Sequence, residues 1–180
     1  TLKWLKERDK KMPFLICAQY KTPHIHRLPP PKFMGQYDQV DFPVPHTFFD
    51  NFSSRSSFVS ETWMALKGMK GHVLNIAPTE PEIEANPKLM PPFLREMTAP
   101  QRAAWHQAYD PRNLKMRELD ESGKLNGENR SLYIYQRFIK DYIRCVDGLD
   151  DQVGRLLRYL KQAGLKENTI VIYSSDQGFF

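Results

Sequence analysis

Residues 133–178 read YIYQRFIKDYIRCVDGLDDQVGRLLRYLKQAGLKENTIVIYSSDQG. Apolar side chains recur there at steps of three and four residues, which predicts an amphipathic helix over about 130–163. The predicted apolar stripe consists of Tyr135, Phe138, Ile139, Tyr142, Val146, Leu149, Val153, Leu156, Leu157 and Leu160. Gly164 is placed to end the helix in a left-handed conformation. The β-branched run that follows predicts a buried strand over about 169–174. A helix, a short turn and a buried strand with a polar tip are typical of α/β proteins.

A second buried strand is predicted near the other end of the chain. Residues 14–20, FLICAQY, form an apolar run between Pro13 and a polar turn, as expected of a strand covered on both faces. A short surface helix is predicted over 1–9. Two strands do not make a covered parallel sheet, so we expect the remaining strands to lie outside this sequence.

The middle of the chain is rich in proline. The tract 23–112 carries all but one of the 14 prolines, and proline interrupts both helices and strand ladders. We therefore expect irregular structure with short helices around 57–67 and 100–108. Gly154 interrupts the long helix, which predicts that another element packs closely there.

These elements predict the internal part of one larger domain. The expected fold is α/β, with a mostly parallel sheet covered by helices that is incomplete within residues 1–180. The first residue is Thr1 rather than methionine, so we expect the natural N-terminus to lie upstream.

Composition narrows the function classes. The net charge is +5, with 26 basic and 21 acidic residues interleaved along the chain, which disfavours nucleic-acid binding. The longest apolar runs are far shorter than the ~20 residues that span a bilayer, so no membrane span is expected. The two cysteines, Cys17 and Cys145, exclude a disulfide framework and a zinc site of the CxxC type. An anionic small substrate remains compatible with this charge.

One candidate site is the tip that follows the strand 169–174. It reads Ser174-Ser175-Asp176-Gln177-Gly178, and open α/β sheets bind ligands at the carboxyl ends of their strands. The carboxylate of Asp176 and the amide oxygen of Gln177 suit Ca²⁺ or Mg²⁺ better than zinc. The alternative is a polar turn in which the aspartate caps the next helix.

A second candidate, Lys21-Thr22-Pro23-His24, follows the strand 14–20. A lysine beside a histidine can hold an oxyanion, and the histidine can protonate a leaving oxygen. The alternative is a solvated lysine and a structural histidine. His24 and His26 also form an HxH pair usable by a metal, although no third ligand is evident.

Other polar and aromatic residues favour structural roles. Asp150 and Asp151 point about 100° apart on a helix and do not chelate one ion easily. Asp147 and Asp151 share a face, and a solvated charge ladder with Arg144 and Arg155 accounts for them. Trp63, Trp105 and the tyrosines at 133, 135 and 142 could line a sugar pocket, although core packing suits most of them better.

Taken together, these segments resemble the type I sulfatases of the alkaline phosphatase superfamily. PFLICAQYKTPHIHRLPPPKF, from residue 13, resembles the family's strand followed by K-x-P-H and a proline-rich loop. The segment from Tyr135 to Phe180 resembles its long helix and the strand that delivers two metal ligands. MTAPQRAAWHQAYDPRN, from Met97, resembles the linker between them.

The resemblance implies an alkaline phosphatase-like fold and a role for four residues. Asp176 and Gln177 would bind a Ca²⁺ ion, with Mg²⁺ less favoured, that also holds the sulfate. His24 would contact the sulfate and help the alcohol leave as a catalytic residue, and Lys21 would support substrate binding beside it. A formylglycine nucleophile is implied as well, together with a sulfated small molecule or glycan as substrate. The family is largely periplasmic, secreted or lysosomal.

The chain departs from the family pattern in one important way. It contains no C/S-x-P-x-R motif, from which formylglycine is made, because Ala-Gln-Tyr follows Cys17 and Val-Asp-Gly follows Cys145. The paired metal-binding aspartates are absent too. We therefore expect these 180 residues to be part of a sulfatase and to have no activity on their own. The alternatives are a phosphohydrolase or phosphonate hydrolase of the same superfamily, or an inactive relative that binds sulfated glycans.

Overall fold

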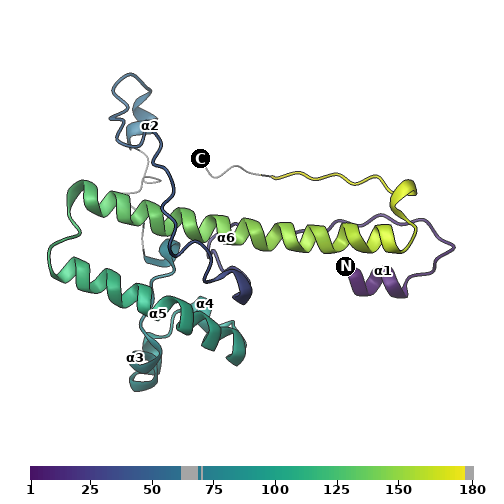
Figure 1. The fold of residues 1–180 in the computed structure, drawn as a ribbon, viewed down its shortest axis with the longest axis horizontal. Coiled ribbons are helices and arrows are strands. Elements are labelled where there is room, and N and C mark those ends of the chain that lie inside the picture. The colour runs from purple at the N-terminus through teal and green to yellow at the C-terminus, as the bar shows by residue number, and fades with distance from the viewer. Residues whose placement is uncertain (62–68, 70, 177–180) are drawn as a thin grey trace. The chain divides into compact units, whose positions relative to one another are not determined.

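The computed structural model describes residues 1–61, 69 and 71–176, and Figure 1 shows their order along the chain. The α-helices are α1 (Leu2–Glu7), α2 (Ser57–Glu61), α3 (Glu80–Ala85), α4 (Pro92–Arg95), α5 (Ala99–Glu121) and α6 (Gly127–Gln162). Short 3₁₀ helices lie between them: η1 (Pro31–Phe33), η3 (Gly71–Leu74), η4 (Pro87–Leu89) and η5 (Lys166–Asn168). The described residues contain no β-strand.

The chain divides into two compact units. The first consists of Thr1–Tyr20 and Leu149–Phe180, and the second of Lys21–Gly148. Helix α6 contributes residues to both units. The interpretation of residues 1–180 as part of one domain stays a prediction.

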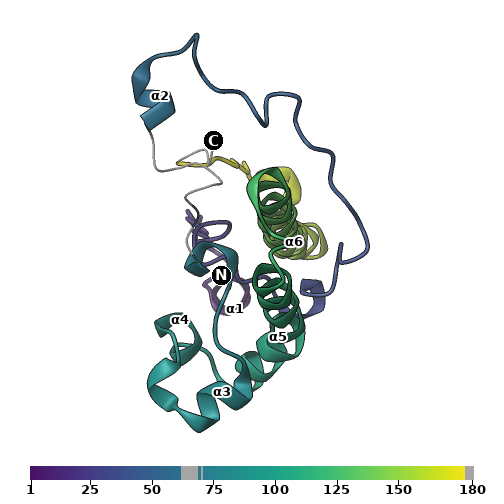
Figure 2. The ribbon, with the colours of Figure 1, turned by 90° about the vertical axis from the view of Figure 1, so that its left-hand side faces the viewer.

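The second unit is built on α5 and the part of α6 before Leu149. These two segments lie side by side (Figures 1 and 2) and are tied by a hydrogen bond of 3.2 Å from Arg137 Nη1 to the carbonyl of Arg112. A hydrophobic core includes residues of α5. It contains Met34, Ala77, Ile83, Phe93, Leu94, Trp105 and Tyr109.

Helix α5 is much longer than the predicted 100–108. Its N-cap is Thr98, whose N–H donates to Gln101 Oε1 at 2.9 Å in a capping box. It then continues past Pro111 to Glu121. An internal proline removes one helical hydrogen bond, but the face that carries Trp105 and Tyr109 is buried. Burial along this face outweighs the local preference, which is why the expected irregular tract ends earlier than 112.

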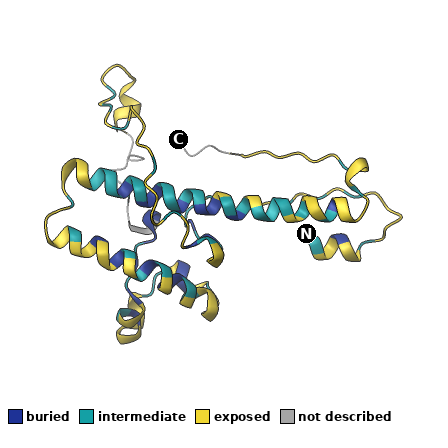
Figure 3. Ribbon diagram, in the orientation of Figure 1, coloured by how far each residue is buried: buried dark blue, intermediate teal, exposed yellow. Residues whose placement is uncertain are grey.

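Helix α6 confirms the long helix predicted over 130–163, and Gly164 ends it with a φ of 67°. Its buried face differs from the predicted stripe, however. Val146 and Leu157 are exposed, whereas three charged side chains are buried. These are Arg137, Asp141 and Arg144, which follow one another at helical spacing. Figure 3 shows how buried, intermediate and exposed segments alternate along the ribbon of α6. Periodicity of apolar residues does not detect a buried face that is lined by paired charges.

The close approach expected at Gly154 lies at Gly148 instead. A Cβ atom at Gly148 would stand 2.6 Å from Cδ of Pro30, whereas at Gly154 it would meet only the side chain of Arg158, which belongs to the same helix. The proline ring therefore requires a glycine at position 148.

The predicted buried strands are extended but exposed in the structure. Leu15 and Ile170 are each 91% exposed, and Ile172 is 85% exposed. A strand needs a neighbouring strand to pair its backbone groups, and the described part of the chain supplies none. The described residues therefore do not bury these runs, and their burial in a sheet completed outside residues 1–180 stays a prediction.

Two smaller expectations have mixed outcomes. Helix α2 starts within the predicted range 57–67, but residues 62–68, including Trp63, lie outside the described residues. Helix α1 confirms the short helix predicted over 1–9. Among the helices described, none is long and apolar enough to cross a bilayer.

Candidate active site

The second unit contains a pocket that joins Lys21 and His24. Its volume is about 340 Å³, within the range of ~300–1,000 Å³ typical of small-molecule sites. The loop after the first extended segment and the junction of α4 with α5 line it. The lining residues are Lys21, Thr22, His24, His26, Leu28, Phe93, Glu96, Met97 and Gln101.

A tight turn places Lys21 and His24 together. The N–H of His24 donates to the carbonyl of Lys21 at 2.9 Å, which closes a four-residue turn. Both side chains are exposed. The two residues can therefore present an ammonium group and an imidazole to the same ligand, as the sequence predicts.

The imidazole of His24 is held in one tautomer. Its Nδ1 lies 2.6 Å from the carbonyl oxygen of Ile25. A carbonyl only accepts hydrogen bonds, so Nδ1 carries the proton and donates it. Nε2 is consequently the nitrogen that can accept a proton or, once protonated, deliver one.

His26 forms part of the pocket wall. Its ring stacks on Phe93 with centroids 4.6 Å apart, and Phe93 in turn packs edge-on against Trp105. Among the described residues, no group of three or more His, Cys, Asp or Glu is arranged to bind a metal. Both histidines of the HxH pair line the pocket.

Two polar residues that line this pocket are not identified from the sequence. Glu96 and Gln101 flank the start of α5, about seventy residues along the chain from His24. Gln101 already accepts the capping hydrogen bond from Thr98. Glu96 and Gln101 reach the pocket because the α4–α5 junction packs against the loop that carries His24. No local sequence motif predicts this tertiary contact.

The predicted metal ligands belong to the first unit. Asp176 is exposed at the end of the extended segment and forms no hydrogen bond or ion pair with the described residues. Its free carboxylate is the hard oxygen donor that Ca²⁺ prefers, so its chemistry fits the ion. Gln177 lies outside the described residues. The convergence of Asp176 and Gln177 with His24 stays a prediction.

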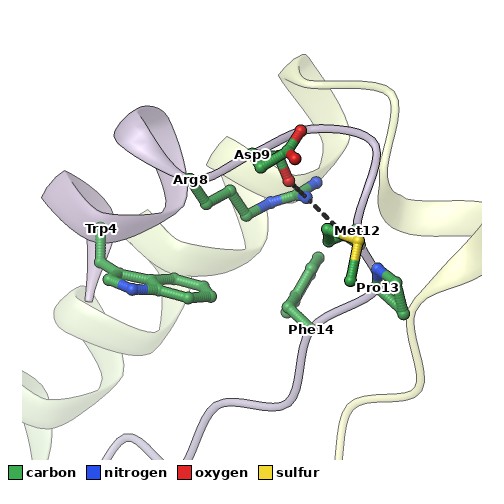
Figure 4. A pocket seen from close by; sticks show the side chains of 6 residues that line it. All are labelled: Trp4, Arg8, Asp9, Met12, Pro13 and Phe14. Carbon is green, nitrogen blue, oxygen red and sulfur yellow. Dashed lines mark hydrogen bonds between the residues drawn. The ribbon is translucent and has the colours of Figure 1, made fainter.

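A second pocket lies in the first unit, near α1 (Figure 4). Its volume is about 280 Å³, and Trp4, Arg8 and Phe14 are among the residues that line it. Arg8 donates to the carbonyls of Asp9 and Met12 at 2.9 and 3.0 Å, and its guanidinium lies over the ring of Phe14. The polar contacts of Arg8 thus fasten the end of α1 to the following segment, and this pocket offers no predicted site residue.

Comparison with known proteins identifies relatives of this chain. The family model described as Sulfatase matches residues 1–179. An N-acetylglucosamine-6-O-sulfatase of Bacteroides thetaiotaomicron is 30% identical over 182 aligned residues, which cover 100% of this chain and 32% of that protein. The solved structure of BT4656 in complex with its substrate, D-glucosamine-2-N,6-O-disulfate, superposes with a TM-score of 0.82. That alignment has 27% sequence identity and covers 93% of this chain and 34% of the other. The chain therefore spans about a third of the length of these relatives.

Proposed function

The chain belongs to the sulfatase family, and from this premise we propose that the protein containing it hydrolyses sulfate esters. The observation that carries the proposal is the pocket shared by Lys21 and His24. Fold membership alone does not fix a function, but a cation and a proton donor at one pocket form a suitable site for an anionic ester.

Lys21 and His24 would act on different parts of the substrate. The ammonium group of Lys21 can form charge-assisted hydrogen bonds to the sulfate oxygens. Protonated Nε2 of His24 can donate its proton to the oxygen that bridges sulfur and carbon as that bond breaks. Because Nδ1 is engaged by the carbonyl of Ile25, the proton leaves from Nε2, and the alcohol departs neutral rather than as an alkoxide.

We propose Asp176 and Gln177 as the residues of this chain that hold a Ca²⁺ ion. When bound, that ion would supply positive charge that stabilises the sulfate oxygens in the transition state. The formylglycine nucleophile is proposed to come from outside these 180 residues. An amide at position 177, rather than the histidine that zinc favours, supports sulfate over phosphate as the preferred ester.

The exposed apolar runs support a parallel sheet in the complete protein. We propose that residues 14–20 and 169–174 become strands of an alkaline phosphatase-like sheet by pairing with strands elsewhere in the polypeptide. Their exposed fractions, 91% for Leu15 and Ile170, are those of side chains that still lack a covering layer.

The proposed substrate class is a 6-O-sulfated glucosamine. The names of both relatives support this choice, and the pocket has matching chemistry. The stacked rings of His26 and Phe93 offer an apolar wall, while Glu96 and Gln101 offer hydrogen-bonding groups. Sugar rings need both kinds of surface.

The experiment compares two esters of the same sugar. The natural polypeptide that contains this chain is purified and supplied with N-acetylglucosamine 6-sulfate or N-acetylglucosamine 6-phosphate. We expect release of sulfate with a kcat/KM at least about tenfold above that for phosphate, which corresponds to about 1.4 kcal/mol. Preferential phosphate release would identify a phosphohydrolase. Binding of the sulfated sugar without turnover would identify a glycan-binding relative instead.

A further inference from the structure

The loop that carries His24 is anchored three residues further on, at Arg27. This residue is completely buried, and both its main chain and its side chain are held. Its carbonyl accepts a hydrogen bond of 2.7 Å from Asn75 Nδ2, and its Nη1 donates to the carbonyl of Val73 at 3.2 Å. Its guanidinium also lies 4.3 Å above the ring centre of Phe138. Burial lowers the pKa of Arg27, which Asp141 partly offsets.

Asn75 is suited to this anchor by its backbone and by its side chain. Its φ is 52°, a left-handed conformation that asparagine tolerates better than most residues. Its Nδ2 donates to the carbonyl of Arg27 and, at 2.9 Å, to Oδ2 of Asp141. Both neighbours only accept hydrogen bonds, so the amide nitrogen must face them. The side chain is completely buried.

Asp141 fixes the orientation of that amide. It is 2% exposed and lies on α6. Its Oδ1 accepts hydrogen bonds from the hydroxyl of Tyr109 at 2.9 Å and from Nη1 of Arg144 at 2.8 Å. Burial, followed by the charge of Asp141, raises the pKa of Tyr109 well above its ordinary value, so the phenol keeps its proton and remains a donor.

We propose that Asn75 and Asp141 are positioning residues for His24. They line no part of the pocket but lock the carbonyl of Arg27, and thereby the end of the loop on which His24 sits. The inference rests on the proposed role of His24 as proton donor. Proton transfer depends on placement within a fraction of an ångström, and a displacement of ~1 Å can cost about 100-fold in rate.

The test is Asn75→Gly, because glycine retains the left-handed backbone conformation while the side chain, with its amide, is removed. It is made in the natural polypeptide and compared with His24→Ala. Two readouts are taken: kcat for an alkyl sulfate against an aryl sulfate, and the alkaline limb of the kcat profile on the alkyl ester. N-acetylglucosamine 6-sulfate and 4-nitrophenyl sulfate serve as substrates. A phenolate leaves without a proton, whereas an alcohol needs one.

We expect Asn75→Gly to lower kcat on the alkyl sulfate about 10–100-fold with little change in KM. The aryl sulfate should be affected much less, and the alkaline limb should flatten. His24→Ala should show the same pattern more strongly. Tyr109→Phe removes one hydrogen bond to Asp141 and should show the same pattern weakly. If Asn75→Gly does not fold, the result for Tyr109→Phe tests the positioning role instead. Asn86→Gly, at the start of η4, is the control and should leave both rates unchanged.

Each contrary result has its own meaning. If His24→Ala shows the pattern but Asn75→Gly and Tyr109→Phe lower both substrates equally or not at all, the positioning role is overturned while the proposed function stands. If His24→Ala itself shows neither signature, the proposed role of His24 fails, and the positioning role fails with it.

Discussion

At the scale of single residues, a motif after an apolar run marks a polar tip in the sequence, whereas a buried charge leaves no such local signal. Lys21 and His24 could be chosen because a polar motif follows an apolar run, and the structure places them at one pocket. Asn75 and Asp141 could not, since each looks like an ordinary loop or surface residue until folding buries it. Asn75 and Asp141 are 66 residues apart in the chain, and Tyr109 lies 32 residues before Asp141, so no local spacing encodes these contacts.

Gly148 provides a prediction at this scale. Gly148→Ala should destabilise the protein by about 1–2 kcal/mol, because overpacking against the rigid Pro30 ring exceeds the gain in helix propensity. Gly154→Ala on the same helix is the matched control. It meets only a flexible arginine side chain and should stabilise the protein by up to about 1 kcal/mol. Urea unfolding measures both, and effects of equal sign would contradict the close approach at Gly148.

Cys145 gives a second prediction. The thiol is completely buried, and burial raises its pKa to about 12. Only the thiolate reacts readily with iodoacetamide, so Cys145 should remain unmodified in the folded protein at pH 8. It should be labelled once urea is added. Peptide mass analysis checks this result, and equal labelling rates in both states would show that the residue is accessible.

At the scale of elements, the long helix α6 is predicted almost to its ends, because it combines strong periodicity with a glycine stop. The full length of helix α5 is not predicted, because Pro111 lies inside it and proline usually indicates the end of a helix. The pocket needs α5, whose first turn brings Gln101 beside the His24 loop. Local propensity thus misses the element that completes the site, because its stability comes from tertiary burial.

Helix α3 carries a prediction about pH. Glu82 accepts hydrogen bonds from Arg117 and from the N–H and hydroxyl of Thr79, and these contacts lower its pKa from 4.5 to about 2. A carboxyl with a lowered folded pKa contributes stability above pH 4.5 and loses it as pH falls toward 2. Glu82→Gln should therefore flatten the acid dependence of unfolding within that window. The same slope in wild type and Glu82→Gln would refute the linkage.

At the scale of the whole molecule, the sequence identifies the family, whereas the described structure supplies only part of the expected fold. The two apolar runs look like sheet strands because they are short, apolar and bounded by turns, yet a sheet is a property of several strands together. The chain covers 32% of one relative and 34% of the other. The proposed strand pairing and the proposed metal site would therefore depend on residues that no pattern within these 180 can specify.

The central claim is that Lys21 and His24 form the place where the sulfate group binds. The most direct measurement is inhibition of the natural polypeptide by inorganic sulfate, in the wild type and in Lys21→Ala, with Lys88→Ala as a control on η4. Hydrogen bonds to charged groups contribute about 1.5–3 kcal/mol. We therefore predict that Lys21→Ala raises the inhibition constant for sulfate about 10–100-fold while Lys88→Ala leaves it unchanged. An inhibition constant that is the same in all three proteins would contradict the account.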